Sequence, residues 1–284
     1  MTTEQGAADR IRTTSVRGLQ VRLSERPATG RLTSEPPLLL CNGIGASLEA
    51  LQPFVDHLEP GRGVVRFDVP GVGGSPAPPY PYAIAGLSSW VTAMMARLGH
   101  REFDVLGLSW GGGLAQQLAV QSRRRVRRVV LVATGTGTLM VPAHPRVLAK
   151  MLTPRRHRDP AYALEIAPTI YGGSMRTDPK RGADLLHAMT RAGPKRGYYL
   201  QLAAMTGWTS LPFLRLIRQP TLVLGGDDDP IIPLANPRMQ ARLIPHARLH
   251  VYHGGHLGIV TEAAELAPVV DAFLNEETTH DRAR

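Results

Sequence analysis

Short apolar runs alternate along most of this chain with longer segments in which apolar residues recur every three or four positions. The first pattern predicts buried β-strands and the second predicts amphipathic helices. The predicted strands are 15–23, 37–41, 64–67, 103–108, 129–133, 221–224 and 248–252. The predicted helices are 47–58, 84–98, the segment after residue 109, 234–243 and 261–274. Strands separated by helices indicate an α/β fold, with a mostly parallel sheet covered by helices on both faces and residues 15–23 as an early antiparallel strand.

This alternation stops between residues 136 and 219. The stretch contains helix-like patches but no convincing strand, and it is rich in Met, Arg, Tyr and Pro. A crossover between parallel strands needs only about a dozen residues, so a stretch this long predicts an inserted helical cap rather than ordinary crossover helices. The expected organisation is a core of residues 14–135 and 220–277, a cap of residues 136–219, and flexible tails at 1–13 and 278–284.

Composition narrows the class of protein. A chain of 284 residues, 43% of them hydrophobic, is long enough for one large α/β domain with an inserted subdomain. No apolar run reaches the ~20 residues that a membrane span needs. The first residues lack the basic-then-apolar order of a signal peptide, and the single cysteine, Cys41, excludes an internal disulfide framework. Together these features favour a cytoplasmic protein.

The chain is strongly basic, with a formal net charge of +10. Its densest basic cluster is Arg-Arg-Arg-Val-Arg-Arg at 123–128. Such a cluster can mark a surface for nucleic acid or for lipid. No aromatic residues interleave with these arginines and no nucleic-acid-binding module is visible. The favoured interpretation is therefore a solvated helix end, where arginines suit the negative end of the helix dipole, and no nucleic-acid partner is expected.

Residues 107–111, Gly-Leu-Ser-Trp-Gly, are the strongest chemical signal. They lie between a predicted strand and a predicted helix, and a G-x-S-x-G sequence in that setting is a nucleophile elbow. The sharp turn presents the Oγ of Ser109 to a cleft. It also places the N–H of Trp110 at a helix N-terminus, where it can donate to a developing oxyanion. A glycine-rich turn with an incidental serine is the alternative. Motifs elsewhere in the sequence are needed to distinguish the two interpretations.

With this elbow the chain resembles the α/β-hydrolases, in which an acid and then a histidine follow the serine along the chain. Similar hydrolases place the acid three residues after a glycine and four before a proline. Gly226 and Pro233 give that spacing to Asp229, and Asp228 is the second choice. Asp227 and Asp228 are otherwise interpreted as carboxylates of a turn or of the surface.

The resemblance implies that His256 is the general base, because residues 254–257, Gly-Gly-His-Leu, match the histidine loop of the family. His253 is interpreted as an ordinary loop histidine. A metal site built on these two histidines would need a third ligand, and none lies nearby in the sequence. We therefore expect neither a metal nor a cofactor.

The second oxyanion donor is expected in residues 42–45, Asn-Gly-Ile-Gly, which follow the first predicted parallel strand. The resemblance implies that the N–H of Ile44 acts together with that of Trp110. Many relatives carry His-Gly here, and Asn42 replaces the histidine. We expect its amide to hold the loop by hydrogen bonding.

Residues 68–75 match a D-x-x-G-x-G-x-S loop of the family. They lack the lysine and the following helix of a phosphate-binding loop, so their glycines are expected to serve turn geometry.

The chain resembles, more particularly, the intracellular poly(3-hydroxyalkanoate) depolymerases that act on medium-chain polyesters. The resemblance runs from about residue 37 to 273 and depends most on 41–46, 67–75, 109–112, 167–173, 207–210 and 226–230. The matches in the cap count most, because caps vary widely among α/β-hydrolases. The resemblance implies a carboxylic ester hydrolase that cleaves storage polyester to 3-hydroxyalkanoate units through an acyl-enzyme, without a cofactor. A further expectation from the resemblance is that the protein associates with polyester granules.

A polyester chain needs an apolar slot for its alkyl side chains, and the cap could form one. The candidate substrate-binding residues are Asn42, Met140, Tyr171, Tyr198, Tyr199 and Trp208. Ordinary packing between cap and core is the alternative for each of them.

Two other functions remain open. A carboxylesterase or thioesterase for soluble acyl substrates would carry the same three residues, and a non-catalytic receptor or granule-associated protein could retain them on the same fold. Ser109 argues against a halide- or epoxide-processing enzyme, which would need an aspartate there. It also argues against a polyester synthase, which would be expected to have a cysteine at that position.

Overall fold

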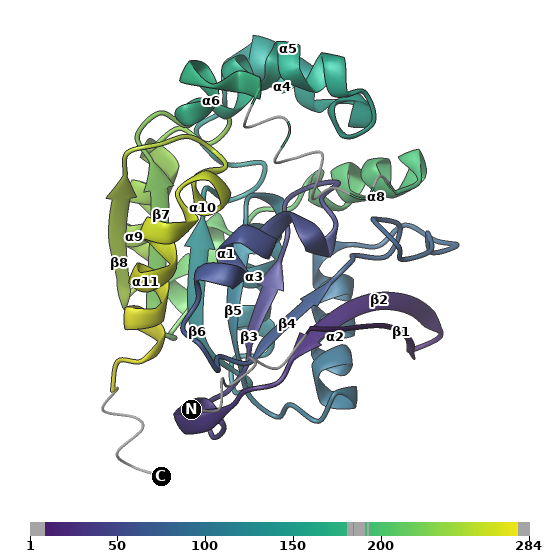
Figure 1. Cartoon of the computed structure of the whole chain (residues 1–284), viewed down its shortest axis with the longest axis vertical. Helices are drawn as coiled ribbons and strands as arrows, with labels where there is room; N and C mark the ends of the chain where they lie inside the picture. The colour runs from purple at the N-terminus through teal and green to yellow at the C-terminus, as the bar shows by residue number, and fades with distance from the viewer. Residues whose placement is uncertain (1–8, 181–183, 185–190, 192, 278–284) are drawn as a thin grey trace, which may run out of the picture.

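An eight-stranded sheet runs through the centre of the part of the chain that the structure describes (Figure 1). The structure is a computed structural model, which describes residues 9–180, 184, 191 and 193–277. The strand order is β1-β2-β4-β3-β5-β6-β7-β8. All neighbours from β4 to β8 pair in parallel, whereas β2 pairs antiparallel with both β1 and β4. The strands are β1 (Arg10–Val16), β2 (Leu19–Arg26), β3 (Leu38–Cys41), β4 (Val64–Phe67), β5 (Phe103–Leu108), β6 (Val126–Val132), β7 (Thr221–Gly226) and β8 (Ala247–Tyr252).

Helices cover both faces of this sheet. One face carries α2 (Ile84–Arg97), α3 (Trp110–Gln121) and α9 (Ala235–Leu243), and the other carries α1 (Gln52–His57), α10 (Gly258–Thr261) and α11 (Ala263–Leu274). The predicted α/β fold with a mostly parallel, doubly covered sheet is therefore confirmed. None of the helices within the described ranges has the length and apolar character needed to cross a membrane.

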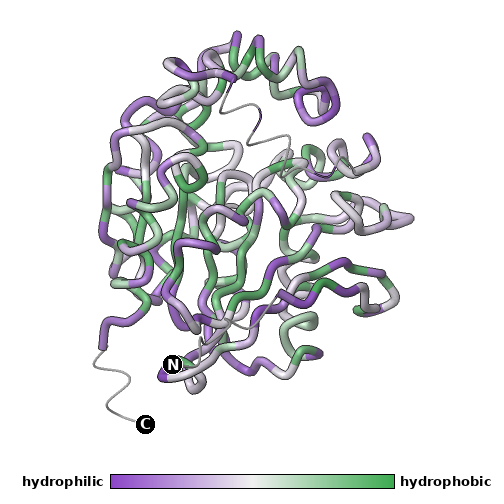
Figure 2. Tube along the Cα trace, viewed as in Figure 1, coloured by the Kyte–Doolittle hydropathy of each residue, from purple (hydrophilic) through white to green (hydrophobic). Residues whose placement is uncertain are grey.

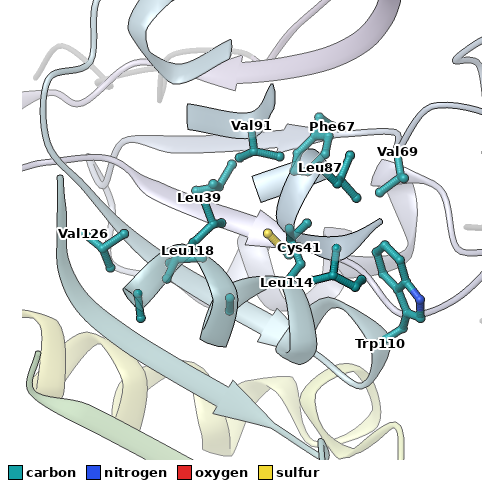
Figure 3. Packing of buried hydrophobic residues seen from close by; sticks show 14 of the residues in the cluster. Leu39, Cys41, Phe67, Val69, Leu87, Val91, Trp110, Leu114, Leu118 and Val126 are labelled. Carbon is teal, nitrogen blue, oxygen red and sulfur yellow. The ribbon is translucent and has the colours of Figure 1, made fainter. Parts of the chain in front are cut away.

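The buried apolar residues divide by the alternation of side chains along each strand. In β3, Leu39 and Cys41 point into the layer under α2 and α3, while Leu38 and Leu40 point into the layer under α1 and α11. Figure 3 shows the first of these layers, where Leu114 on α3 packs near Cys41. Hydrophobic residues follow the central strands through the middle of the molecule (Figure 2). Because both faces are covered, the strands are nearly continuous apolar runs, which made them easy to find in the sequence.

Between β6 and β7 the described residues form helices joined by loops, and their only strand-like pairing is an isolated bridge between Gly137 and Thr209. In Figure 1, α4, α5 and α6 lie at the top, beyond the arrowheads of β6, β7 and β8. The elements are α4 (Pro145–Met151), η3 (Pro154–His157), α5 (Pro160–Tyr171), α6 (Ser174–Thr177), α8 (Lys195–Met205) and η4 (Leu211–Leu216). We call this segment the cap; its limits at 136 and 219 stay a prediction.

The N-terminal region differs from the expectation of one strand over 15–23. It is a hairpin, in which β1 and β2 are joined by a tight turn at Arg17 and Gly18, with φ values of 47° and 81°. Residues 10–13, expected in a flexible tail, belong to β1. The exposed polar side chains of β1 hid the strand, because only its partner β2 contributes much to the core. Residues 278–284, the other predicted tail, lie outside the described residues.

The predicted helix 47–58 is divided in two, and a separate short helix, α10, precedes the helix predicted over 261–274. Residues 48–51 form a 3₁₀ turn before α1, which begins next to Pro53, and α10 is separated from α11 by Glu262. Apolar spacing alone could not show these breaks, because the apolar positions continue through them.

The arginine cluster is only partly a solvated helix end. Arg123 and Arg124 are exposed just after α3, as expected, but the chain then enters β6. Arg127 donates to both carboxylate oxygens of Asp104, at 3.0 and 2.7 Å, and also pairs with Glu35. These arginines therefore include structural ion pairs, which reduces the positive charge that is free at this surface.

The Asp104–Arg127 pair gives a test of stability. Asp104 has no solvent exposure, so Asp104→Ala leaves the Arg127 guanidinium without its bidentate partner. We expect the free energy of unfolding to fall by roughly 3 kcal/mol. Arg124→Ala, in the same cluster but exposed, should change it by less than about 0.5 kcal/mol. Urea unfolding followed by tryptophan fluorescence measures both, and equal effects would contradict the structural role of the pair.

Candidate active site

Ser109 stands on a sharp turn between β5 and α3. Its backbone has φ 54° and ψ −117°, a left-handed conformation that non-glycine residues seldom adopt. The turn brings the start of α3 so close to the end of β3 that a side chain on Gly111 would overlap the carbonyl oxygen of Cys41. The second glycine of the G-x-S-x-G sequence is therefore needed for this approach, and the predicted strand–turn–helix geometry is present.

The structure brings His256 and Asp229 together with Ser109. The Nε2 atom of His256 lies 2.9 Å from Ser109 Oγ, and its Nδ1 atom lies 2.8 Å from Asp229 Oδ2. The other oxygen of Asp229 accepts hydrogen bonds from the N–H groups of Ile231 and Ile232, at 2.8 and 2.9 Å. His256 and Asp229 are 3% and 8% exposed, so the hydrogen bond between them is shielded from water. The serine follows β5, the acid follows β7 and the histidine follows β8, all at one edge of the sheet.

The three adjacent aspartates each have a different partner. Asp228 accepts from Arg176 at 2.7 and 3.0 Å and from the N–H of Gly173, and the hydrogen bond from Arg176 holds the pKa of Asp228 below its usual range. Asp227 lies 2.9 Å from His253 Nδ1, an interaction that raises the pKa of His253 and lowers that of Asp227. Only Asp229 faces His256, as the motif spacing predicted.

His253 is largely exposed, and its ring faces Asp227 rather than the serine. The two histidines of the His-x-x-His sequence thus have separate carboxylate partners. Within the described residues, no group of three His, Cys, Asp or Glu side chains is arranged to hold a metal ion.

The loop after β3 lies against the elbow. A side chain on Gly43 would stand 3.6 Å from Ser109 Cβ, and Ile44 lies beside the serine in the same pocket. Asn42 is buried, and its amide donates to the carbonyl of Ser47 at 2.8 Å. Asn42 thus holds the loop by hydrogen bonding, as expected. It does not line the pocket, so it is not placed to bind substrate there.

The loop of residues 68–75 is organised by Asp68. This fully buried carboxylate accepts from the N–H groups of Leu48 and Gly74, each at 2.7 Å, and from Arg22 at 3.1 Å. The loop is therefore built as a turn around an internal carboxylate, which agrees with the interpretation of its glycines as turn residues.

A pocket opens over Ser109, between the core and the cap. It encloses about 720 Å³ of space not filled by atoms, open solvent included. The core contributes mostly small and apolar side chains, and the cap contributes larger and more polar ones. The lining residues are Gly43, Ile44, Ala46, Ala50, Leu108 and Ser109 from the core, Met151, Arg156, His157, Ala163 and Tyr171 from the cap, and His256, Leu257 and Val260 from the last loop.

The predicted cap residues divide into one that lines this pocket and four that do not. Tyr171 lines it. Tyr198 is buried behind it and borders a smaller neighbouring pocket, while Tyr199 is 47% exposed with its ring edge-on to Tyr198. Trp208 donates to Gln117 on α3 at 2.9 Å, and Met140 packs against the buried cluster of α5. The prediction that Tyr199, Trp208 and Met140 line the pocket is thus corrected: Tyr199 is a surface residue, and Trp208 and Met140 are packing residues.

The lining residues that sequence reasoning missed are Met151, Arg156, His157, Ala163, Leu257 and Val260, with Ala46 and Ala50 in the core. Leu257 and Val260 could have been found from their closeness to His256 in the sequence. The cap residues offered no such signal, because their positions depend on how the cap helices fold back over the sheet.

One cap segment is packed against the loops that carry Asp229 and His256. The carbonyl of Tyr171 accepts the N–H of His256 at 2.7 Å. Gly172, with φ 64°, lies so close to the acid loop that a side chain there would overlap the carbonyl oxygen of Asp228. Together with the ion pair between Arg176 and Asp228, these contacts join the end of α5 to both loops.

Comparison with known proteins identifies the class. A family model described as alpha/beta hydrolase fold matches residues 36–169 and 176–263. This chain belongs to the α/β-hydrolase family. It is 47% identical over 268 residues to a poly(3-hydroxyalkanoate) depolymerase from Ectopseudomonas oleovorans, covering 94% of this chain and 93% of that protein. The resemblance found from the motifs is thereby confirmed.

More distant relatives share the fold. The chain is 24% identical to 3-oxoadipate enol-lactonase 2 from Acinetobacter baylyi, over 87% of this chain and 91% of that protein. The crystal structure of an enol-lactonase from Burkholderia xenovorans LB400 aligns with a TM-score of 0.79 at 25% identity, covering 93% of this chain and all of that one.

The two neighbouring aspartates provide a test of the site. If Asp229 orients the histidine, Asp229→Asn should lower kcat for p-nitrophenyl octanoate by about 10⁴-fold, because the amide favours the wrong imidazole tautomer. Asp228→Asn should lower it by less than about 10-fold, since its partner is Arg176. Circular dichroism of both variants checks folding. Comparable losses of kcat in two folded variants would contradict the assignment of Asp229 as the acid.

Proposed function

We propose that this protein is a serine hydrolase that cleaves the ester bonds of poly(3-hydroxyalkanoate), with a preference for medium-chain-length polymer. The observation that carries the proposal is the hydrogen-bonded chain from Ser109 through His256 to Asp229 at the base of a pocket closed by the cap. The identity of 47% to a depolymerase over nearly the whole chain supports the choice of substrate. The largely apolar lining suits the alkyl side chains of such a polyester.

The reaction begins when Ser109 Oγ attacks the ester carbonyl while His256 Nε2 accepts its proton. The N–H groups of Ile44 and Trp110 stabilise the oxyanion of the tetrahedral intermediate. The intermediate collapses as His256 returns the proton to the leaving 3-oxygen, which gives a free hydroxyl and an acyl-enzyme on Ser109. Water, activated by His256, then attacks the acyl-enzyme. It releases a carboxylic acid and restores the serine.

Asp229 supports each proton transfer. Its Oδ2 accepts from Nδ1 of His256, which leaves Nε2 free to take the proton of the serine and stabilises the imidazolium that forms. Its Oδ1 is fixed by the N–H groups of Ile231 and Ile232, so the carboxylate keeps its orientation during the cycle. The proposed setting is the cytoplasm, at the surface of polyester granules, where such a polymer is stored.

Clearing of polymer suspensions tests this function. Wild-type protein should clear turbid suspensions of amorphous medium-chain granules, and short-chain granules more slowly. Ser109→Ala should clear neither, because it lacks the nucleophile. Labelling of Ser109 by a fluorophosphonate and hydrolysis of p-nitrophenyl octanoate serve as controls for an active wild-type enzyme.

Two results would overturn the proposal. Hydrolysis of p-nitrophenyl octanoate without clearing of any granules would identify a carboxylesterase or thioesterase for soluble substrates. A folded wild-type protein that shows neither labelling nor turnover would identify a non-catalytic member of the family.

A further inference from the structure

A buried arginine forms part of the wall of the pocket that contains Ser109. Arg156 lies in the 3₁₀ helix η3 of the cap, between α4 and α5, and only 5% of it is exposed. It lines the same pocket as Ser109 and His256. The proposed ester cleavage makes no use of this charge, so its presence there needs a separate explanation.

Arg156 is held by neutral groups. Its Nη1 donates to the hydroxyl of Tyr198 at 2.8 Å and lies 3.5 Å from the carbonyl of Thr153, and its guanidinium lies 5.3 Å from the centre of the Tyr198 ring. Its Nε is buried without a hydrogen-bond partner among the described residues. Burial lowers the pKa of Arg156, but the phenol oxygens of Tyr171 and Tyr198 outweigh this effect and raise the pKa above its ordinary value. The group is therefore a fixed positive charge.

Two other buried arginines of this protein have carboxylate partners. Arg62 pairs with Asp271, and Arg66 pairs with Asp9. Arg156 has no ion pair with any aspartate or glutamate that the structure describes. A buried charge without a counter-ion costs several kcal/mol, which an anionic ligand in the pocket would offset.

The proposed reaction supplies such an anion. Every poly(3-hydroxyalkanoate) chain ends in a carboxylate, and a planar guanidinium fits a carboxylate through two parallel hydrogen bonds. We propose that Arg156 binds the terminal carboxylate of a polyester chain or oligomer, so that the enzyme removes units from the carboxyl end. This inference rests on the proposed function and adds to it the end group that is recognised and the direction of cleavage.

The terminal 3-hydroxyalkanoate unit is short enough for one pocket to hold both its carboxylate and the ester bond that is cleaved. In a 3-hydroxyalkanoate at the carboxyl end, the carboxyl carbon is separated from the ester oxygen by only two carbon atoms. A carboxylate held by Arg156 thus fixes, through a short tether, the oxygen that His256 must protonate. After cleavage, attack of water on the acyl-enzyme leaves a new carboxylate on the shortened chain. Each turnover regenerates the group that is recognised.

A pair of substrates that differ in one charge tests the proposal. The substrates are the linear dimer of 3-hydroxyoctanoate with a free carboxylate and the methyl ester of the same dimer. Wild type should hydrolyse the central ester of the free acid with a kcat/KM roughly 10- to 100-fold higher, the factor expected for a charge-assisted hydrogen bond. In Arg156→Met this ratio should fall to about one, mainly through KM, and Arg156→Lys should retain part of it.

Arg155→Met is the matched control. It removes the same charge from the neighbouring position, but Arg155 is exposed and pairs with Asp159. It should keep the wild-type ratio, which separates a local contact from general attraction of anions to a basic protein. Circular dichroism and the rate of fluorophosphonate labelling at Ser109 check that Arg156→Met folds with a reactive serine.

A wild-type ratio near one would overturn the proposal, as would equal losses of kcat/KM for both dimers in Arg156→Met. Inhibition separates this failure from failure of the proposed function. If wild type hydrolyses p-nitrophenyl octanoate but neither dimer, the polyester function fails. Carboxylate binding is then tested by inhibition of p-nitrophenyl octanoate hydrolysis. Binding by Arg156 predicts that 3-hydroxyoctanoate inhibits more strongly than its methyl ester and that Arg156→Met removes this difference in inhibition. Equal inhibition by the two compounds in wild type contradicts it.

Discussion

The strained turn at Ser109 is the constraint on which the site depends. A left-handed conformation at a non-glycine residue costs about 1–3 kcal/mol and persists only when its surroundings fix it. Here the Ser109 N–H donates to Val132 on β6, and the Ser109 carbonyl accepts from the hydroxyl of Thr134 at 2.7 Å. The strands on either side of β5 therefore fix the turn. Contacts with β6 and the residues after it hold the backbone of Ser109, and β3 sets how closely the start of α3 approaches the sheet. The position of the nucleophile is a property of the sheet as a whole.

The acid loop shows how three like charges can occupy consecutive positions. Asp227, Asp228 and Asp229 have separate partners, which are His253, Arg176 of the cap and His256. His253 lowers the pKa of Asp227 and Arg176 lowers that of Asp228, so both partners stabilise the charged carboxylate and reduce repulsion between neighbours. The loop is thereby fixed from three directions, and one of these is the cap. The position of Asp229 consequently depends on a part of the chain that the sheet does not organise.

Much of this architecture could be predicted from the sequence. Buried parallel strands are apolar runs, so five of the predicted strands agree closely with β3 to β5, β7 and β8, and chemistry at the ends of such strands could be placed by motif spacing, as with Asp229. The hairpin of β1 and β2 was not predicted, because its outer strand is mostly exposed and polar. The pocket wall was harder still. Aromatic content suggested Trp208 and Tyr199 as pocket residues. The contacts between cap helices instead place Arg156 in the pocket wall. In the sequence alone, the basic Pro-Arg-Arg-His at 154–157 suggests only a solvated surface.

The contact between the end of α5 and the catalytic loops has a consequence for how the cap can move. The hydrogen bond from the His256 N–H to Tyr171 and the ion pair between Arg176 and Asp228 lie within a few residues of each other. Lifting this end of the cap would break both at once and release the histidine and acid loops together. The cap is attached to the core at a second place, because Gln201 on α8 accepts the N–H of Gly45 at 2.7 Å and the indole N–H of Trp110 at 2.9 Å. The positions of the loops that carry Asp229 and His256 are therefore coupled to the position of the cap.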